Sequence, residues 1–473
     1  MLPIVAIPEV VTHYAPYFKE VFSETEFVHF QKYITGLMVS ENKTIQAMNN
    51  LFVINPINQS TLNRFLTASK YERRKVQGKC LNLLNSQEAT AFKANGAYGG
   101  VLIMDDTLLE HYGKHFDEIA KLYDHVSKNY VTAHNLVNLH YSDDKTDYPI
   151  NFELWKPANI ETLEQTLRAA GINIKPKQEA YKKNEPKKWR NYLLYLHNKH
   201  IEKHGVREAY RTKIIIAEDL LRDFYERYPD KNIPSCFDTW FTSPKFCKFI
   251  DELKRAYVGG IKTDEVVMLS HEKKMTLEDF AKELKQKHFS DNSSKPVFGK
   301  VTIEYKEKKE VYYNYCQVHH INGFGRVKLL ISHTEEDLSD TARMFISNQL
   351  HWQVQQITRV GRHRWPIEVY HKEGKAEGLD KYQVRDFTAI EKHVSMVITV
   401  YSLLKHAQYD NALLQNLQNQ LNIEVKGSLA NWRRTIQAQG LWLLLQWIDA
   451  SIKHGSSLEE IMQILQPAFG LSS

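Results

Sequence analysis

The pattern of hydrophobic and polar positions divides the chain into helical and β-rich regions. Residues 18–95 follow a helical period, and a polar break at "NPINQS" separates two short predicted helices, Thr44–Asn50 and Ser60–Ser69. Such a pair is typical of a helix-turn-helix-like region. The basic segment Lys70–Lys79 comes next, so DNA contact is one interpretation of residues 1–95, beside an ordinary helical surface.

Strand patterns begin at residue 99, where "GGVLIMDDT" forms a continuous apolar run that ends in acids. Two more β-rich stretches follow, "KNYVTAHNLVNLHYS" and "TDYPINFELWKP". The pattern is helical again from Ile160 to Tyr228, and "IPSCFDTWFTS" (233–243) then predicts another strand that ends in an acid. A helix and a strand are expected in "SPKFCKFIDELKRAYVGGIKT". This order of elements predicts an α/β fold.

A second β-rich block runs from Val297 to Asn348 and contains a glycine-rich turn, "NGFG". Everything from Thr388 to the end is helical in pattern, and no internal repeat is present. A chain of 473 residues is too long for one ordinary hydrophobic core. We therefore expect two or three domains.

Composition excludes several protein classes. Hydrophobic residues make up 42% and charged residues 25%, as in globular proteins, and no apolar stretch is long enough to span a bilayer. The N-terminal segment is interrupted by prolines and has no basic start, so it does not resemble a signal peptide, and we expect a cytoplasmic protein. The four cysteines lack CxxC pairing, which favours reduced thiols over a zinc site or disulfides.

Positive charge is concentrated in one segment. The net charge is only +6, but Lys175–Arg190 holds seven lysines and arginines against two glutamates. Phosphate contact is one interpretation and a solvated linker is the other. For the first interpretation the candidate DNA-binding residues are Lys182, Lys183, Lys187 and Lys188.

A second concentration of cations surrounds a carboxylate in "RWPIEVYHKEGK", residues 364–375. Pro366 suits a first helical turn, and no breaker follows before Gly374, so Glu368, His371 and Lys375 are expected on one helix face. For an isolated stretch, a solvated face of weak salt bridges is the ordinary interpretation.

Acidic residues end two of the predicted strands. Asp106, with Asp105 beside it, ends the first apolar run, and Asp238 ends another strand far along the chain. The carboxyl ends of strands in α/β sheets are where functional groups gather. Acids held close together repel unless a divalent cation lies between them, and oxygen ligands favour Mg²⁺ or Mn²⁺. Singly, each acid is more often a turn or helix cap.

Three segments, "LIMDDT", "CFDTWFTS" and "RWPIEVYHKEGKAEGLDKYQVR", together resemble the active-site blocks of the DDE transposases of bacterial insertion sequences, which have a ribonuclease H-like core. The family's third block reads Tyr-x2-Arg-x3-Glu-x6-Lys, and Arg364, Glu368 and Lys375 match it. Gly361 occupies the tyrosine position. The second β-rich block resembles the insertion domain of the branch that forms hairpin-ended DNA intermediates.

The resemblance implies a role for each matching residue. Asp106, Asp238 and Glu368 would be the catalytic triad that holds Mg²⁺ or Mn²⁺, with Asp105 as the second candidate for the first position. Two such ions would activate water and stabilise the leaving 3′ oxygen. Arg364 and Lys375 would hold phosphate, whereas His371 and Lys372 are interpreted as ordinary surface. Most aromatic residues near these blocks are expected in the core, but one of them is a candidate for stacking on an unpaired base; the candidates are Tyr312, Tyr313, Tyr315, Trp240 and Trp365.

The expected activity is cleavage at transposon ends followed by joining of the 3′-OH ends to target DNA. The alternatives are a related nuclease without strand transfer and an inactive transposase-derived DNA-binding protein. The expected partners are double-stranded DNA and a second copy of the chain on the DNA ends, with no membrane and a nucleoid location. The predicted regions are 1–95, helical and DNA-binding; 96–260, the ribonuclease H-like core with the basic segment; 261–350, the β-rich insertion; 351–405, the final core helices; and 406–473, helical.

Overall fold

The computed structural model describes residues 2–113, 115–203, 205–270, 272–290, 296–425 and 427–470. It is a mixed α/β protein, as predicted, and its chain forms two compact units. The first unit contains the residues up to 105, residues 138–151 and those from 227 onward, and the second contains residues 106–137 and 152–226. In the part of the chain that the structure describes, no helix is long and apolar enough to cross a membrane.

The N-terminal part of the first unit is helical, as predicted. Its second helix starts at a capping box, in which the Ser23 and Glu26 side chains each accept a hydrogen bond from the other residue's backbone N–H. The helices predicted on either side of "NPINQS" are present as α3 and α4. The elements here are α1 (Glu9–Tyr14), η1 (Ala15–Val21), α2 (Glu24–Val39), α3 (Ile45–Leu51), α4 (Gln59–Thr67), α5 (Arg73–Asn85) and η2 (Gly96–Tyr98).

A mixed sheet forms the centre of the first unit. Three strands that the sequence predicts, β1, β5 and β6, run parallel in that order. The helix α12 (Pro244–Glu252) connects β5 to β6. The sheet continues from β6 in the order β12, β11, β10, β7 and β8, and β9 pairs with β10. The bounds are β1 (Val101–Glu110), β5 (Ser235–Phe237), β6 (Tyr257–Gly260), β7 (Val266–Met268), β8 (Lys274–Thr276), β9 (Gly299–Tyr305), β10 (Lys308–Ile321), β11 (Gly325–His333) and β12 (Arg343–Ser347).

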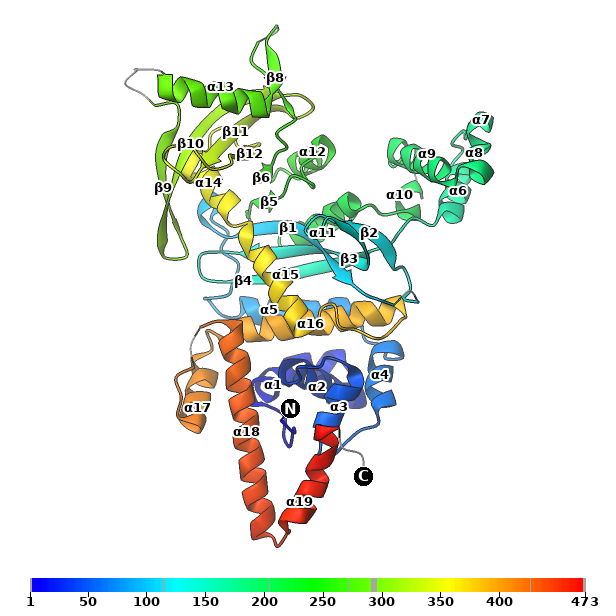
Figure 1. Ribbon diagram of the computed structural model, residues 1–473, viewed down its shortest axis with the longest axis vertical. Coiled ribbons are helices and arrows are strands. Elements are labelled where there is room, and N and C mark those ends of the chain that lie inside the picture. Colours follow the sequence, from blue (N-terminus) through cyan, green and yellow to red (C-terminus); the bar gives the residue numbers. More distant parts are fainter. Residues whose placement is uncertain are drawn as a thin grey trace. The chain divides into compact units, whose positions relative to one another are not determined.

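The β-rich block predicted as an insertion is continuous with this sheet. Strand β12 pairs antiparallel with β6, with Phe345 opposite Gly260 and Ser347 opposite Val258. Figure 1 shows β10, β11 and β12 as one curved layer with helix α13 (Leu277–Ser290) beside it. The sequence analysis does not predict α13. The block therefore extends the strands that carry the predicted acids.

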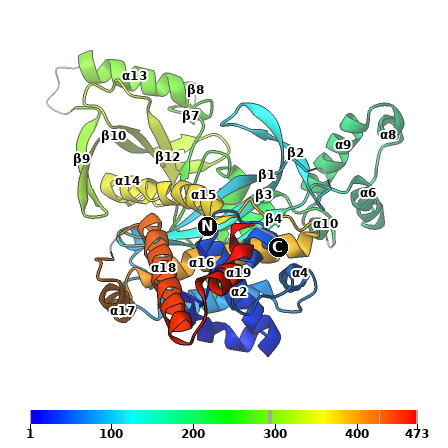
Figure 2. The same cartoon turned by 60° about the horizontal axis from the view of Figure 1, so that its bottom comes forward.

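The C-terminal part of the first unit is helical, as predicted. Helix α16 is buried almost all round and packs on α2 and α5. Helices α18 and α19 lie alongside α2 and α3 (Figures 1 and 2), where Leu444, Ile461 and Leu465 form a core with Ile4 and Phe52. The helices are α14 (Val354–Arg362), α15 (Trp365–Glu377), α16 (Phe387–Ala407), α17 (Asn411–Leu421), α18 (Leu429–Lys453), α19 (Leu458–Leu465) and η3 (Gln466–Phe469).

The second unit combines a β-hairpin with a group of helices. Strand β2 pairs antiparallel with the first part of β3, which continues into the first unit and pairs there with β4. The helices between residues 160 and 209 have a hydrophobic core of their own, built from Leu163, Leu167, Trp189, Leu193 and Leu196 among others. The elements are β2 (Ala120–Asp124), β3 (Asn129–Ser142), β4 (Asp147–Trp155), α6 (Ile160–Ala169), α7 (Pro176–Glu179), α8 (Tyr181–Asn184), α9 (Pro186–Lys199), α10 (Val206–Ala209) and α11 (Lys213–Arg227).

Candidate active site

Strand register places Asp105 and Asp238 side by side. In the parallel pair β1–β5, Ile103 lies opposite Cys236 and Met104 lies opposite Phe237, so the next step along both chains brings Asp105 opposite Asp238. Side chains alternate along a strand, so Asp238 lies on the same face of the sheet as the buried thiol of Cys236. Asp105 lies on this face of β1 as well. The pKa of this thiol is raised to about 12, mainly by burial; Arg364 acts to lower the pKa, and Asp238 and Asp105 act to raise it.

The neighbouring acid, Asp106, points to the other face of β1. In the second unit its carboxylate accepts hydrogen bonds from the Asn135 amide and, at 2.9 Å, from the Lys213 ammonium group. The Lys213 ammonium group therefore neutralises the charge of the Asp106 carboxylate. The sequence analysis names Asp106 as the first triad member, whereas the structure places Asp105 on the face that Asp238 shares.

Asp238 also shapes the turn that follows β5. Its Oδ1 accepts hydrogen bonds from the backbone N–H groups of Trp240 and Phe241, each at 3.0 Å. The close approach of β6 supports this turn, since a Cβ at Gly259 would lie 2.6 Å from the Phe237 ring and 2.7 Å from the Thr242 hydroxyl oxygen. The cap interpretation of Asp238 is therefore correct, and the cap fixes the direction of the carboxylate.

The third block supplies a guanidinium group to these acids. Arg364 Nη2 donates to Glu368 Oε1, and Nη1 lies 3.8 Å from Asp105 Oδ2. Burial lowers the pKa of Arg364, but Glu368 and Asp105 outweigh it and hold the pKa above its usual value. Arg364 thus links an acid within β1 to an acid on α15.

Helix α15 begins at Trp365 with Pro366 in its first turn, as predicted. It continues through Gly374 and ends at Gly378, which adopts φ 110°. A Cβ at Gly374 would lie 3.4 Å from the Leu379 side chain. Lys375 lies two turns beyond Glu368 on the same side of the helix.

The interpretation of His371 as surface is wrong, whereas Lys372 is exposed as expected. The His371 ring is buried, and its Nε2 accepts a hydrogen bond from the Asn138 amide at 3.1 Å. Burial lowers the pKa of this ring to about 3, and His140 and Lys375 add to the decrease. His371 is therefore a neutral core residue of the helix that carries Glu368.

Gly361, in the position of the family's tyrosine, lies on α14 against β12. A Cβ at this position would lie 3.4 Å from the Phe345 ring.

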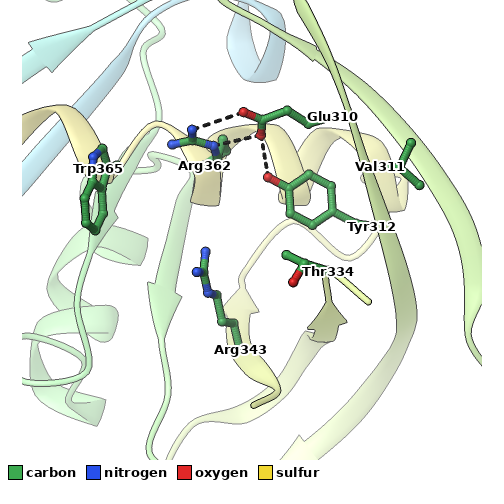
Figure 3. A pocket seen from close by; sticks show the side chains of 7 residues that line it. All are labelled: Glu310, Val311, Tyr312, Thr334, Arg343, Arg362 and Trp365. Atoms are coloured by element: carbon green, nitrogen blue, oxygen red, sulfur yellow. Dashed lines mark hydrogen bonds and ion pairs between the residues drawn. The ribbon is translucent and has the colours of Figure 1, made fainter. Parts of the chain in front are cut away.

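A hollow of about 490 Å³ lies beside the third block (Figure 3). The Arg362 guanidinium makes a paired interaction with Glu310, with N···O distances of 2.8 and 3.1 Å, and stacks 4.2 Å from the Tyr305 ring centroid. Arg343 and Trp365, which is 53% exposed, also line the hollow. The sequence analysis names Trp365 among several aromatic candidates but names neither arginine, and the partners of Arg362 come from distant strands.

The predicted basic segment forms α7, α8 and the start of α9 in the second unit. Two of its four candidate lysines are engaged within the unit: Lys182 pairs with Glu164 at 2.8 Å, and Lys188 pairs with Glu185. Lys183 and Lys187 are exposed. The four lysines are therefore not equivalent, which the sequence pattern does not show.

The described residues include no cluster of three or more His, Cys, Asp or Glu side chains already arranged around one point as a metal cage. Arg364 nevertheless contacts Asp105 and Glu368, and the strand register sets Asp238 beside Asp105. All three offer carboxylate oxygens, the donors that Mg²⁺ and Mn²⁺ prefer. The residues present thus fit a divalent ion in donor chemistry.

Asp105 within β1 and Asp238 just after β5 lie at adjacent positions of a parallel strand pair, and Arg364 contacts Asp105 and Glu368. Residues 16–279, more than half of the chain, match the family described as DDE superfamily endonuclease. The chain belongs to this family. No curated protein matches the chain. The family match includes Asp105 and Asp238 and ends before Glu368.

Membership in this family supports a nuclease or transposase type of enzyme that cleaves DNA with divalent metal ions. The mixed α/β fold is compatible with that assignment.

Proposed function

We propose that the protein is a DDE transposase with a ribonuclease H-like core, which cleaves phosphodiester bonds at transposon ends and joins the 3′-OH ends to target DNA. The observation that carries the proposal is the register of β1 and β5, which sets Asp105 against Asp238, together with the Arg364 contacts to Asp105 and Glu368. Two carboxylates alone are common at strand ends. The added arginine link to a third acid supports a phosphate-processing site.

In this proposal Asp105, Asp238 and Glu368 hold Mg²⁺ or Mn²⁺, which when bound lowers the pKa of water and stabilises charge on a leaving oxygen. Asp105 replaces Asp106 as the first member, because Asp106 is engaged by Asn135 and Lys213. Arg364 and Lys375 orient the phosphate of the scissile strand. The Asp238 turn keeps its carboxylate in a fixed direction before DNA arrives.

The proposal is tested with labelled DNA taken from the element that flanks the gene. Incubation with the full chain and Mg²⁺ or Mn²⁺ should nick the strand at the element end, and pre-cut ends mixed with plasmid should give joined product. Nicking without joining would instead identify a nuclease. The absence of both, with binding retained, would identify an inactive DNA-binding relative.

Replacement of Arg364 by lysine should reduce the nicking rate about 10-fold. Lysine keeps the positive charge but loses the planar fork with which Arg364 contacts Asp105 and Glu368 at once. Single-turnover nicking measures the effect. Lys372→Ala, on the exposed side of the same helix, is the control and should nick at the wild-type rate. Full activity of Arg364→Lys would show that the fork has no role.

Replacement of Lys183 and Lys187 together by alanine should weaken DNA binding at every sequence. Each lost phosphate contact reduces the slope of log K against log salt by about 0.9, so the double variant should lose nearly two units. The matched control replaces Lys182 and Lys188, which already pair with Glu164 and Glu185, and should change the slope less. Equal slopes for wild type and Lys183→Ala/Lys187→Ala would make this segment a linker.

A further inference from the structure

Helix α9 has one face in the core of the second unit and one face exposed. Trp189, Leu193, Leu196 and His197 are buried, at helical spacing. This packing against α6 and α8 fixes the rotation of α9 about its axis (Figure 1).

The exposed face of α9 carries Lys187, Asn191 and Tyr195, four residues apart, and Tyr195 is 58% exposed. Successive helix positions differ by about 100°, so Arg190 and Lys188 lie on opposite sides of this line. The outward surface therefore has a centre of hydrogen-bonding side chains and a cation on each flank.

Helix α9 contains no acidic residue, although it carries four basic ones, Lys187, Lys188, Arg190 and Lys199. The acidic residues on either side of α9 in sequence are Glu185, which pairs with Lys188 of this helix, and Glu202, whereas Glu179 pairs with Arg168 at 2.6 Å. Glu164 of α6 binds both Arg168 and Lys182. Charge complementarity therefore points to a polyanion as the occupant of this face.

The shape and side chains of the face suit the DNA major groove. The groove is about 12 Å wide and admits one α-helix, and a helix of 14 residues is about 21 Å long. An asparagine amide matches the N6 and N7 edge of adenine. Lys187 and Arg190 can meet phosphates of the groove walls, whereas Lys188 already pairs with Glu185.

We propose that α9 is the recognition helix of this protein, entering the major groove of the element ends and reading bases with Asn191. The inference rests on the proposed function and specifies its DNA-recognition step. It goes beyond phosphate contact by the basic segment, because it assigns sequence selection to a helix face that includes an uncharged residue, Asn191.

The test selects bound DNA from a library of duplexes with 20 random base pairs (about two helical turns of B-DNA). The full chain is used in EDTA, so that no cleavage occurs. Wild type should enrich a motif, and Asn191→Ala should lose preference at one or two adjacent positions. Its affinity for the wild-type motif should fall about 5- to 100-fold, while its affinity for the unselected library stays within about twofold.

The matched control is Asn173→Ala, which removes an exposed amide of the same unit outside α9 and should select the wild-type motif. A wild-type motif retained by Asn191→Ala, or no motif from wild type, overturns the inference. Nicking by the same preparations with Mn²⁺ separates the two proposals. If the protein nicks DNA but selects no motif, only this inference is overturned. If it selects an Asn191-dependent motif but never nicks, only the proposed function is overturned.

Discussion

Asp238→Asn should lower strand nicking by roughly 10²–10³-fold while DNA binding and folding persist. The change removes a negative oxygen ligand but keeps the side-chain size. Lewis-acid stabilisation is worth several kcal/mol, and about 1.4 kcal/mol corresponds to a tenfold rate change. The amide oxygen can still accept hydrogen bonds from Trp240 and Phe241, so the turn after β5 should survive. A labelled element end, assayed in parallel with a gel shift, measures both properties.

Asp105 and Asp106 provide an internal control for this prediction. Asp105→Asn should be as severe as Asp238→Asn, since their strands place the two side chains together. Asp106→Asn should cost less, because its partners are Asn135 and Lys213. Wild-type nicking by Asp238→Asn would remove the basis of the proposed active site, and a larger defect in Asp106→Asn would return the first position to Asp106.

Acidification should destabilise the fold strongly below pH 6.5 because three buried histidines must remain neutral. Burial is the main cause that lowers the pKa of His363 to about 4, of His371 to about 3 and of His393 to about 4. Hydrogen bonds accepted by ring nitrogens from the Asn138 amide, for His371, and from the Tyr33 hydroxyl, for His393, also need neutral rings.

The direction of this pH effect on stability follows from the number of protons bound by the folded and the unfolded chain. Between pH 6.5 and about 4 these histidines are protonated when unfolded and neutral when folded, so stability is present above pH 6.5 and is lost as the pH falls. One pKa unit corresponds to about 1.4 kcal/mol, so three histidines contribute a loss of about 6 kcal/mol between pH 7 and pH 5. That is of the order of the total stability of a domain.

Urea denaturation followed by tryptophan fluorescence at pH 7, 6 and 5 measures this loss. His371→Gln, which leaves an amide near Asn138 but no titratable ring, should reduce the pH dependence by about one third. A free energy of unfolding that does not change between pH 7 and pH 5 would contradict the neutral assignment of all three rings.

Element types could be predicted from the sequence because they depend on local periodicity. The strand that carries Asp105, the strand before Asp238, the helix after Pro366 and the helical C-terminal part all occur where the pattern indicates them, but β1 continues past the two acids to Glu110. The choice between Asp105 and Asp106 could not be made, because it depends on which residue of β5 lies opposite. That register is a long-range property.

The burial of polar residues could not be predicted from the local sequence pattern either. His371 is part of a charged stretch, and only the packing of α15 shows that its ring faces inward to Asn138. The unequal lysines of the basic segment have the same explanation. Glu164, which engages Lys182, lies on another helix 18 residues earlier in the chain.

The pairing of β12 with β6 has a consequence for engineering the chain. Excision of residues 261–350 would leave β6 as an open sheet edge, with the backbone groups that now bond to Phe345, Ile346 and Ser347 left facing solvent. An unprotected edge of this kind is a template for pairing with other chains, and hence for aggregation. The β-rich block thus acts as the edge protection of the sheet that carries Asp105 and Asp238, so a shortened version of this protein needs a replacement strand at β6.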